Sequence, residues 1–201
     1  MHICAAKPFV GFTSTHRIEH FMRTPLLLSA VIAASVACTD ISDPNEVVAR
    51  AAATMRTSAG VVAGTAEITE NAGGFVTVSV NITSLAPGAH GMHVHSLGAC
   101  DGSTPSAFTS AGSHVNPTSR EHGLNNPAGP HDGDLPNLEI GADSRGTLTT
   151  TTGRVRLTTG AASLLDADGS ALVIHANQDD QMTDPFGNSG ARVLCGVFTA
   201  N

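Results

Sequence analysis

Apolar and polar residues alternate strictly in the segment Val76–Ile82, which reads Val-Thr-Val-Ser-Val-Asn-Ile. A half-buried antiparallel strand requires this period of two, because successive side chains point to opposite faces of a sheet. Less regular apolar segments, many separated by Pro-Gly, Asp-Gly or Gly-Gly pairs, predict further strands at 61–69, 89–95, 138–141, 147–157, 172–175 and 192–199. About seven short strands predict an all-β fold, a sandwich or a flattened barrel.

Two long segments follow no period and are rich in Gly, Pro, Asn, Asp and Ser. They span residues 96–136 and 176–190. Loops of this length in a compact domain are usually functional or disordered. We therefore expect the candidate chemistry to lie in these two loops and at the ends of the strands beside them.

Residues 39–58 have the composition of a linker before the domain, which we expect to span 59–201. The run Asp43-Pro44-Asn45-Glu46 is typical of a helix start, and an Ala-rich stretch follows it as far as Met55. The pattern predicts a short helix that acts as a tether.

The segment from Met22 to Cys38 has the pattern of a signal peptide: one basic residue, a short apolar run and then small residues. The run is shorter than the roughly 20 residues that cross a bilayer, so export is the better interpretation than a membrane anchor. Ser35-Val36-Ala37-Cys38 is similar to a bacterial lipobox, with Ser in place of the usual aliphatic residue. Lipidation of Cys38 and plain cleavage after Ala37 both remain open. Residues 1–21 are expected to be a mis-called start or a removed leader, and the mature protein to lie in a bacterial periplasm or cell envelope.

The charge balance narrows the range of partners. The 201 residues include 10 Lys and Arg against 17 Asp and Glu. Beyond Cys38 the balance is 7 against 16, a net charge of −9. An acidic chain is a poor partner for nucleic acid, which basic surfaces bind. Only Cys100 and Cys195 lie beyond Cys38, and export to an oxidising compartment predicts a disulfide between them.

Histidines are concentrated where the pattern predicts loops and strand ends. His93 and His95 flank Val94 in an expected strand, so both imidazoles lie on one face. Such a pair alone could be two surface histidines. Six of the seven histidines beyond Cys38 nevertheless fall in one set, which Asp134 joins: His93, His95, His114, His122, His131 and His175. Imidazoles with one carboxylate suit zinc or copper rather than calcium or magnesium.

These residues carry a family resemblance over about residues 61–198. The matching text is Gly91-Met92-His93-Val94-His95, Gly112-Ser113-His114-Val115-Asn116-Pro117, His122-Gly123, His131-Asp132-Gly133-Asp134-Leu135, Val173-Ile174-His175 and Gly190-Ala191-Arg192-Val193-Leu194-Cys195-Gly196-Val197. In order and spacing it resembles the copper/zinc superoxide dismutases of the bacterial exported type. The resemblance implies a Greek-key flattened β-barrel, an immunoglobulin-like sandwich with two long functional loops.

The resemblance also implies two adjacent metal sites. The implied copper ligands are His93, His95, His114 and His175. The implied zinc ligands are His114, His122, His131 and Asp134. The implied activity converts superoxide to oxygen and hydrogen peroxide, because copper can accept and return one electron whereas zinc is redox-inert. His114 would bridge both metals and carry a proton, and zinc would hold that ring and the loop in place.

Further roles follow from the same resemblance. Arg192 is implied to attract the anionic substrate beside copper, and Asp179 to accept hydrogen bonds from one histidine of each site. His90 is implied to bond within the barrel and to bind no metal. Unlike many relatives, the chain has no Lys or Arg between Asp179 and Arg192.

Two other functions compete with the dismutase. A non-catalytic copper or zinc carrier on the same fold is less favoured, because every implied ligand and the arginine are retained. A zinc hydrolase is less favoured because it needs an isolated three-ligand centre with an open water position. Superoxide is the expected small-molecule partner, and membrane contact is expected only through a lipid on Cys38. The sequence leaves the subunit arrangement open.

Overall fold

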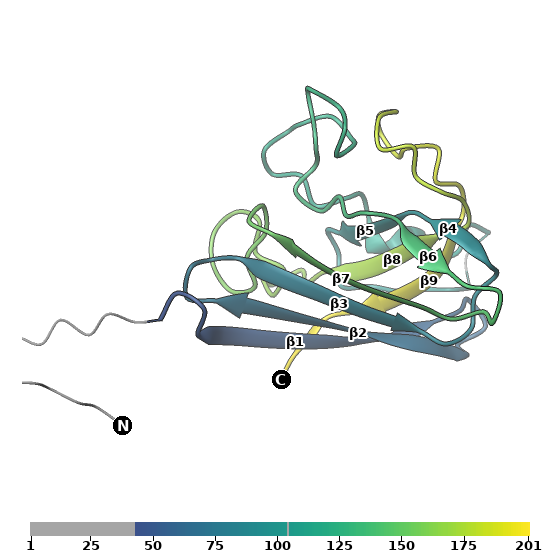
Figure 1. Ribbon diagram of the computed structural model, residues 1–201, viewed down its shortest axis with the longest axis horizontal. Coiled ribbons are helices and arrows are strands. Elements are labelled where there is room, and N and C mark those ends of the chain that lie inside the picture. Colours follow the sequence, from purple (N-terminus) through teal and green to yellow (C-terminus); the bar gives the residue numbers. More distant parts are fainter. Residues whose placement is uncertain (1–42, 104) are drawn as a thin grey trace, which may run out of the picture. The chain divides into compact units, whose positions relative to one another are not determined.

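The computed structural model describes residues 43–103 and 105–201, and these form an antiparallel β-structure (Figure 1). Eleven short elements occur in the described part of the chain: β1 (Val47–Arg56), β2 (Val62–Asn71), β3 (Val76–Ile82), β4 (Gly88–His90), β5 (Met92–His95), the 3₁₀ turn η1 (Thr109–Ala111), β6 (Leu138–Ile140), β7 (Gly146–Thr152), β8 (Ala171–His175), β9 (Arg192–Val197) and β10 (Thr199–Ala200). No described residue belongs to a helix long and apolar enough to cross a membrane.

The main sheet has the strand order β5-β8-β9-β1-β2-β3-β7, with β10 also paired to β1. A second, two-stranded sheet pairs β4 with β6, and β6 lies beside β7. The neighbours β9–β1 and β3–β7 are far apart in sequence, as crossover connections require. The predicted all-β flattened barrel is confirmed.

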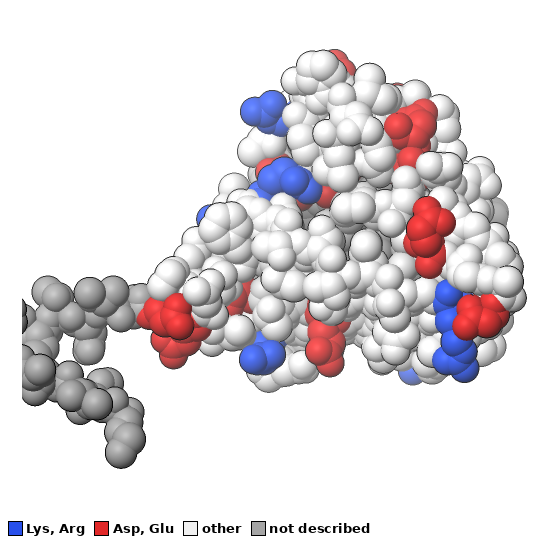
Figure 2. Space-filling view, viewed as in Figure 1, with Lys and Arg blue, Asp and Glu red and all other residues white. Residues whose placement is uncertain are grey.

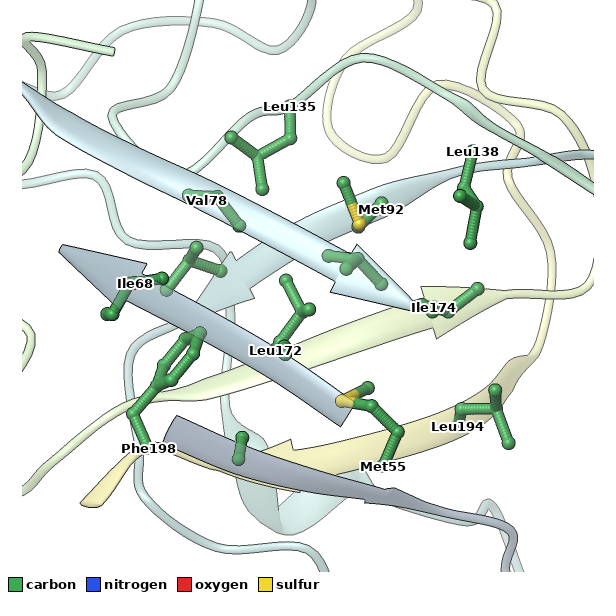
Figure 3. Packing of buried hydrophobic residues seen from close by; sticks show 14 of the residues in the cluster. Met55, Ile68, Val78, Met92, Leu135, Leu138, Leu172, Ile174, Leu194 and Phe198 are labelled. Carbon is green, nitrogen blue, oxygen red and sulfur yellow. The ribbon is translucent and has the colours of Figure 1, made fainter. Parts of the chain in front are cut away.

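The barrel interior is filled by one face of each long strand (Figure 3). In β3, Val76, Val78 and Val80 are buried while the residues between them are more exposed, as the alternation predicts. Met92 and Val94 of β5 and Leu172 and Ile174 of β8 pack in this core. It also contains Met55, Ile68, Leu135, Leu138, Leu194 and Phe198. The sequence therefore predicts both the strand and its inward face.

The short helix expected after residue 43 is wrong, and the part of the expected linker 39–58 that the structure describes contains a strand instead. Residues 47–56 form β1, which pairs with β2 along its length and also contacts β9 and β10. Ala51, Ala53 and Met55 face the core, and the residues between them are less buried. The high helix propensity of alanine favoured a helix, but pairing on both edges of β1 outweighs so weak a local preference. The barrel thus includes residues before the expected boundary at 59.

Other boundaries differ by smaller amounts. The strand expected over 89–95 is divided at Gly91 into β4 and β5. The N–H of Gly91 donates to the carbonyl of Asn177, beyond β8, and its carbonyl accepts from the N–H of His175, the last residue of β8. The strand expected over 147–157 ends at Thr152, and 192–199 divides into β9 and β10. The expected leader, signal peptide and lipid site at Cys38 lie outside the described residues.

Both long loops lie over the same end of the barrel (Figure 1). They touch each other, because the backbone N–H of Asn125 donates to the carbonyl of Gln181 at 3.0 Å. The N–H of Leu124 likewise donates to the Gln181 side-chain oxygen at 3.2 Å. Together the loops cover the outer faces of β5 and β8, where the predicted histidines lie.

Candidate metal centre

The pleat of β5 directs two histidines away from the barrel core. Met92 and Val94 point inward, so His93 and His95 occupy the opposite face. His175 ends the neighbouring strand β8 on the same face as Val173, which packs in a second apolar cluster outside the core. All three imidazoles are buried although they lie outside the barrel interior, because the loops cover them.

The first long loop pairs with the free edge of β5. Isolated bridges join His95 to His114 and His93 to Asp134. The N–H of Val94 donates to Gly133 at 2.9 Å, and the N–H of Val115 donates to Val94 at 2.9 Å. The loop thus brings an imidazole and a carboxylate, 20 residues apart in sequence, to the two strand histidines.

Four histidines form what we call the first cluster: His93, His95, His114 and His175. One ring nitrogen of each has a protein partner: Asp179 for His93 (2.6 Å), Gly112 for His95 (2.9 Å), Asp134 for His114 (2.9 Å) and Gly190 for His175 (3.1 Å). The other nitrogen of each is buried without a partner: Nδ1 of His93 and Nε2 of His95, His114 and His175. Buried polar atoms are normally satisfied, so four unpaired nitrogens in one cluster fit a shared metal ion.

His114, His122, His131 and Asp134 form the second cluster. Oδ1 of Asp134 lies 2.9 Å from Nδ1 of His114, 3.1 Å from Nδ1 of His122 and 3.4 Å from Nδ1 of His131. Nδ1 of His131 lies 3.2 Å from Nδ1 of His114. Ligands about 2.0 Å from a tetrahedral zinc would be about 3.3 Å apart, so these distances fit a zinc ion.

His93 is also close enough to His114, His122 and Asp134 to be grouped with them. Its ring stacks on that of His114 with centroids 4.0 Å apart. The Nε2 atom of His93, however, already meets the Asp179 carboxylate, whereas Nδ1 of His131 lies directly against two members of the second cluster. His131 is therefore the better fourth ligand.

Asp179 connects the two clusters. Its carboxylate accepts hydrogen bonds from Nε2 of His93 at 2.6 Å and from Nε2 of His122 at 3.0 Å. Asn137 holds the backbone of Asp179 through two bonds of 2.8 Å, one donated and one accepted. A carboxylate on the far ring nitrogen fixes the orientation of an imidazole and makes it a stronger ligand.

Protonation differs between the clusters. Burial lowers the pKa of His93 to about 3 and that of His175 to about 4, so both are neutral ligands at physiological pH. Burial also opposes charge on His122, but its hydrogen bonds to Asp134 and Asp179 raise the pKa to about 9. The same histidine contacts outweigh burial at both carboxyl groups and hold the pKa of Asp134 and of Asp179 well below the usual range.

This difference predicts unequal pH dependence of metal binding. Zinc must displace a proton from His122, so zinc affinity should rise about tenfold per pH unit between pH 7 and 8.5 and level off near 9. The lowered pKa values of His93 and His175 predict a much smaller change for copper at the first cluster. Chelator competition at pH 7 and at pH 8.5 measures how the affinity for each metal changes with pH. Equal slopes for the two metals would contradict the assignment.

Arg192 begins β9 beside the first cluster and is half-buried. Its guanidinium donates to the carbonyl of Phe108 at 2.6 Å and to that of Gly112 at 2.7 Å. Gly112 also accepts the bond from His95, so one carbonyl links the arginine to the cluster. Arg192 and His175 line a cavity of about 690 Å³ between the two loops.

The predicted disulfide between Cys100 and Cys195 is confirmed. It joins β9 to the loop segment that carries Phe108, close to the arginine that this segment holds. Phe108 itself is buried in the small cluster beneath this loop together with Val173 and Cys195. The bridge thus anchors the loop that supplies both carbonyl partners of Arg192.

The structure brings all the sequence-predicted site residues together at this end of the barrel. His90 stays apart from the clusters, with ring nitrogens 2.7 Å from the carbonyl of His175 and 2.9 Å from that of Ala86. Three residues of the site have no signal in the sequence: Asn137, Asp184 as a partner of the second cluster, and Arg154, which donates to the carbonyl of Asp134. Each acts through backbone contacts that a residue pattern does not encode.

A flattened all-β barrel whose outer face carries two adjacent clusters of metal-ligating residue types defines a class of β-barrel proteins suited to metal binding. The family model described as copper/zinc superoxide dismutase (SODC) matches residues 62–198. The chain belongs to this family.

Relatives agree with this membership. Superoxide dismutase-like protein YojM of Bacillus subtilis is 42% identical over 144 residues, which cover 71% of this chain and 72% of the relative. Superoxide dismutase [Cu-Zn] of Caulobacter vibrioides is 42% identical over 151 residues, covering 74% and 84%. The crystal structure of a SOD-like protein from Bacillus subtilis covers 73% of this chain and 96% of its own at 40% identity, with a TM-score of 0.68.

Proposed function

We propose that this protein is a superoxide dismutase that holds copper at the first cluster and zinc at the second. The observation that carries the proposal is the position of His114, whose Nδ1 faces the second cluster and whose Nε2 is one of the four unpaired nitrogens of the first. An imidazole placed in this way can ligate a metal on each side. Members of the family named Cu-Zn superoxide dismutase support the choice of metals.

The reaction consumes two superoxide anions and two protons, and it yields oxygen and hydrogen peroxide. Bound copper supplies a centre that accepts one electron and returns it. The chain supplies the remaining requirements. His93, His95 and His175 are fixed by their outer hydrogen bonds, and Nε2 of His114 can hold a proton whenever it is not a ligand.

Arg192 is the cation that we assign to substrate attraction. It lines the cavity that reaches His175, and among the residues lining this cavity it is the only Lys or Arg. Charged side chains are scattered over a mainly uncharged surface in the visible face, with no broad basic patch (Figure 2). The net charge of −9 beyond Cys38 repels an anion at long range, so attraction must be local.

Replacing Arg192 with isoleucine is expected to lower kcat/KM by about tenfold or more, because local charge raises anion association rates by at least that factor. Both metals should be retained. The decline of rate with added salt should also weaken, since salt screens exposed charges over about 8–10 Å. Arg192→Lys, the matched control, should recover part of the rate. An isoleucine variant with the parent rate and salt dependence would place substrate guidance elsewhere, with Arg120 the next residue to test.

We further propose that the protein is exported to the periplasm or cell envelope. The support is the apolar segment that ends at Cys38 together with a disulfide in the barrel. A lipid on Cys38 and a plain cleaved terminus remain the two forms of this proposal.

The experiment that tests the proposed activity compares one purified preparation loaded with copper and zinc against the same preparation loaded with zinc alone. Rapid superoxide decay only in the copper-containing sample supports a dismutase. Full loading with both metals but no activity above free buffer would instead favour a metal carrier.

A further inference from the structure

In each histidine of the two clusters except the shared His114, one ring nitrogen faces the other donor atoms and the second, which we call the outer nitrogen, faces away from them. The outer nitrogens share one kind of partner. Every histidine apart from the shared His114 directs its second nitrogen toward a protein oxygen: Gly112 for His95, Gly190 for His175 and Asp179 for both His93 and His122. For His131 the corresponding atom is Nε2, and it lies 3.6 Å from Oδ1 of Asp184. Asp184 is thus the outer partner of His131, at an ion-pair distance rather than a hydrogen-bond distance.

The same oxygen of Asp184 has a second contact in the second cluster. It accepts a hydrogen bond of 2.7 Å from the backbone N–H of His122. Asp184 belongs to the second long loop, 62 residues from His122 in sequence. One carboxylate therefore restrains two residues of the second cluster from a loop that supplies none of its ligands.

We infer that Asp184 is a positioning residue for zinc. Its negative charge faces the ring nitrogen of His131 that would carry the proton when Nδ1 is a ligand, and this makes the imidazole a stronger donor. Its bond to His122 fixes the backbone of a second ligand. The inference rests on the proposed zinc site and assigns Asp184 no contact with superoxide.

The neighbouring acid, Asp180, serves a different purpose. Its carboxylate accepts bonds from residues of its own loop: the N–H groups of Met182 and Thr183, the Thr183 hydroxyl and the Asn188 amide. Asp180 and Asp184 are the only charged residues between Asp179 and Arg192. This loop therefore carries one carboxylate for its own turn and one for the second cluster.

The test measures zinc affinity of the full barrel by chelator competition at pH 7.5 in three variants. Asp184→Asn removes the charge that faces His131 but keeps an oxygen that can accept from His122. Asp184→Ala removes both contacts, and Asp180→Asn is the matched control on the same loop. Partners of metal-binding histidines contribute about 10–100-fold to metal affinity. We expect about tenfold weaker zinc binding in Asp184→Asn, a larger loss in Asp184→Ala and less than a twofold change in Asp180→Asn.

A second readout separates positioning from loop stability. The melting temperature of metal-free Asp184→Asn should stay close to that of the metal-free parent, while the increase in melting temperature produced by zinc should shrink. If Asp184→Asn binds zinc as tightly as Asp180→Asn, the inference is overturned and the proposed function is untouched. If the parent itself binds zinc no more tightly than His131→Ala, the proposed zinc site fails, and the inference fails with it.

Discussion

Replacing His175 with alanine is expected to remove copper and abolish dismutation while zinc remains bound. His175 contributes an unpaired nitrogen to the first cluster and is not a member of the second. Loss of an outer partner already costs about 10–100-fold in metal affinity, so loss of a ligand should weaken copper binding by more than 100-fold. Metal analysis after dialysis against a weak chelator measures both metals on one sample.

His131→Ala is the reciprocal variant for this experiment. It removes one donor from the second cluster and leaves the four unpaired nitrogens of the first in place. It should therefore release zinc and retain copper. Equal loss of both metals from either variant would contradict the separation of the two sites.

Of the variants described, the one without the disulfide is expected to lose the most free energy of unfolding. The bridge spans 95 residues, for which the chain-entropy model gives a stabilisation of about 4–5 kcal/mol. The free energy of unfolding of a typical domain is only about 5–15 kcal/mol, so the bridge would account for a large part of it. The double variant Cys100→Ala/Cys195→Ala should therefore have a much lower denaturation midpoint in urea, and neither position is left with an unpaired thiol.

The same double variant should also lose part of its activity. The segment that Cys100 anchors supplies the Phe108 and Gly112 carbonyls that hold Arg192. Without the bridge the arginine should be less well fixed, so kcat/KM should fall while copper content stays near the parent value. A change in unfolding free energy below about 1 kcal/mol would show that the bridge contributes little to the barrel.

The sequence predicted the parts of the fold that repeat locally. Val76–Ile82 forms a strand with the expected bounds, and the pleat of β5 places His93 and His95 on one face as their spacing requires. The cysteine pairing was predictable because only two cysteines lie beyond Cys38. By contrast, β1 was missed because its alanines carry no β-branched or aromatic signal, and its strand character comes from pairing with β2, β9 and β10.

The part of the site that could not be predicted depends on contacts between distant loops. Asp184 reaches the N–H of His122 across 62 residues, and Asn137 holds Asp179 across 42. Such contacts depend on the path of the loop backbone. Gly187, at a φ of 59°, illustrates this dependence, because a Cβ there would collide with the Asp179 carboxylate and the His122 ring. Only glycine allows the second loop to lie this close to the clusters.

The most direct test of the two-site account is anomalous diffraction from one crystal of the copper- and zinc-loaded protein, recorded at the absorption edge of each metal. We expect a copper peak among Nδ1 of His93 and Nε2 of His95, His114 and His175. We expect a separate zinc peak among Nδ1 of His114, His122 and His131 and Oδ1 of Asp134. A single metal position, or a zinc peak coordinated by His93 in place of His131, would contradict the two-site account.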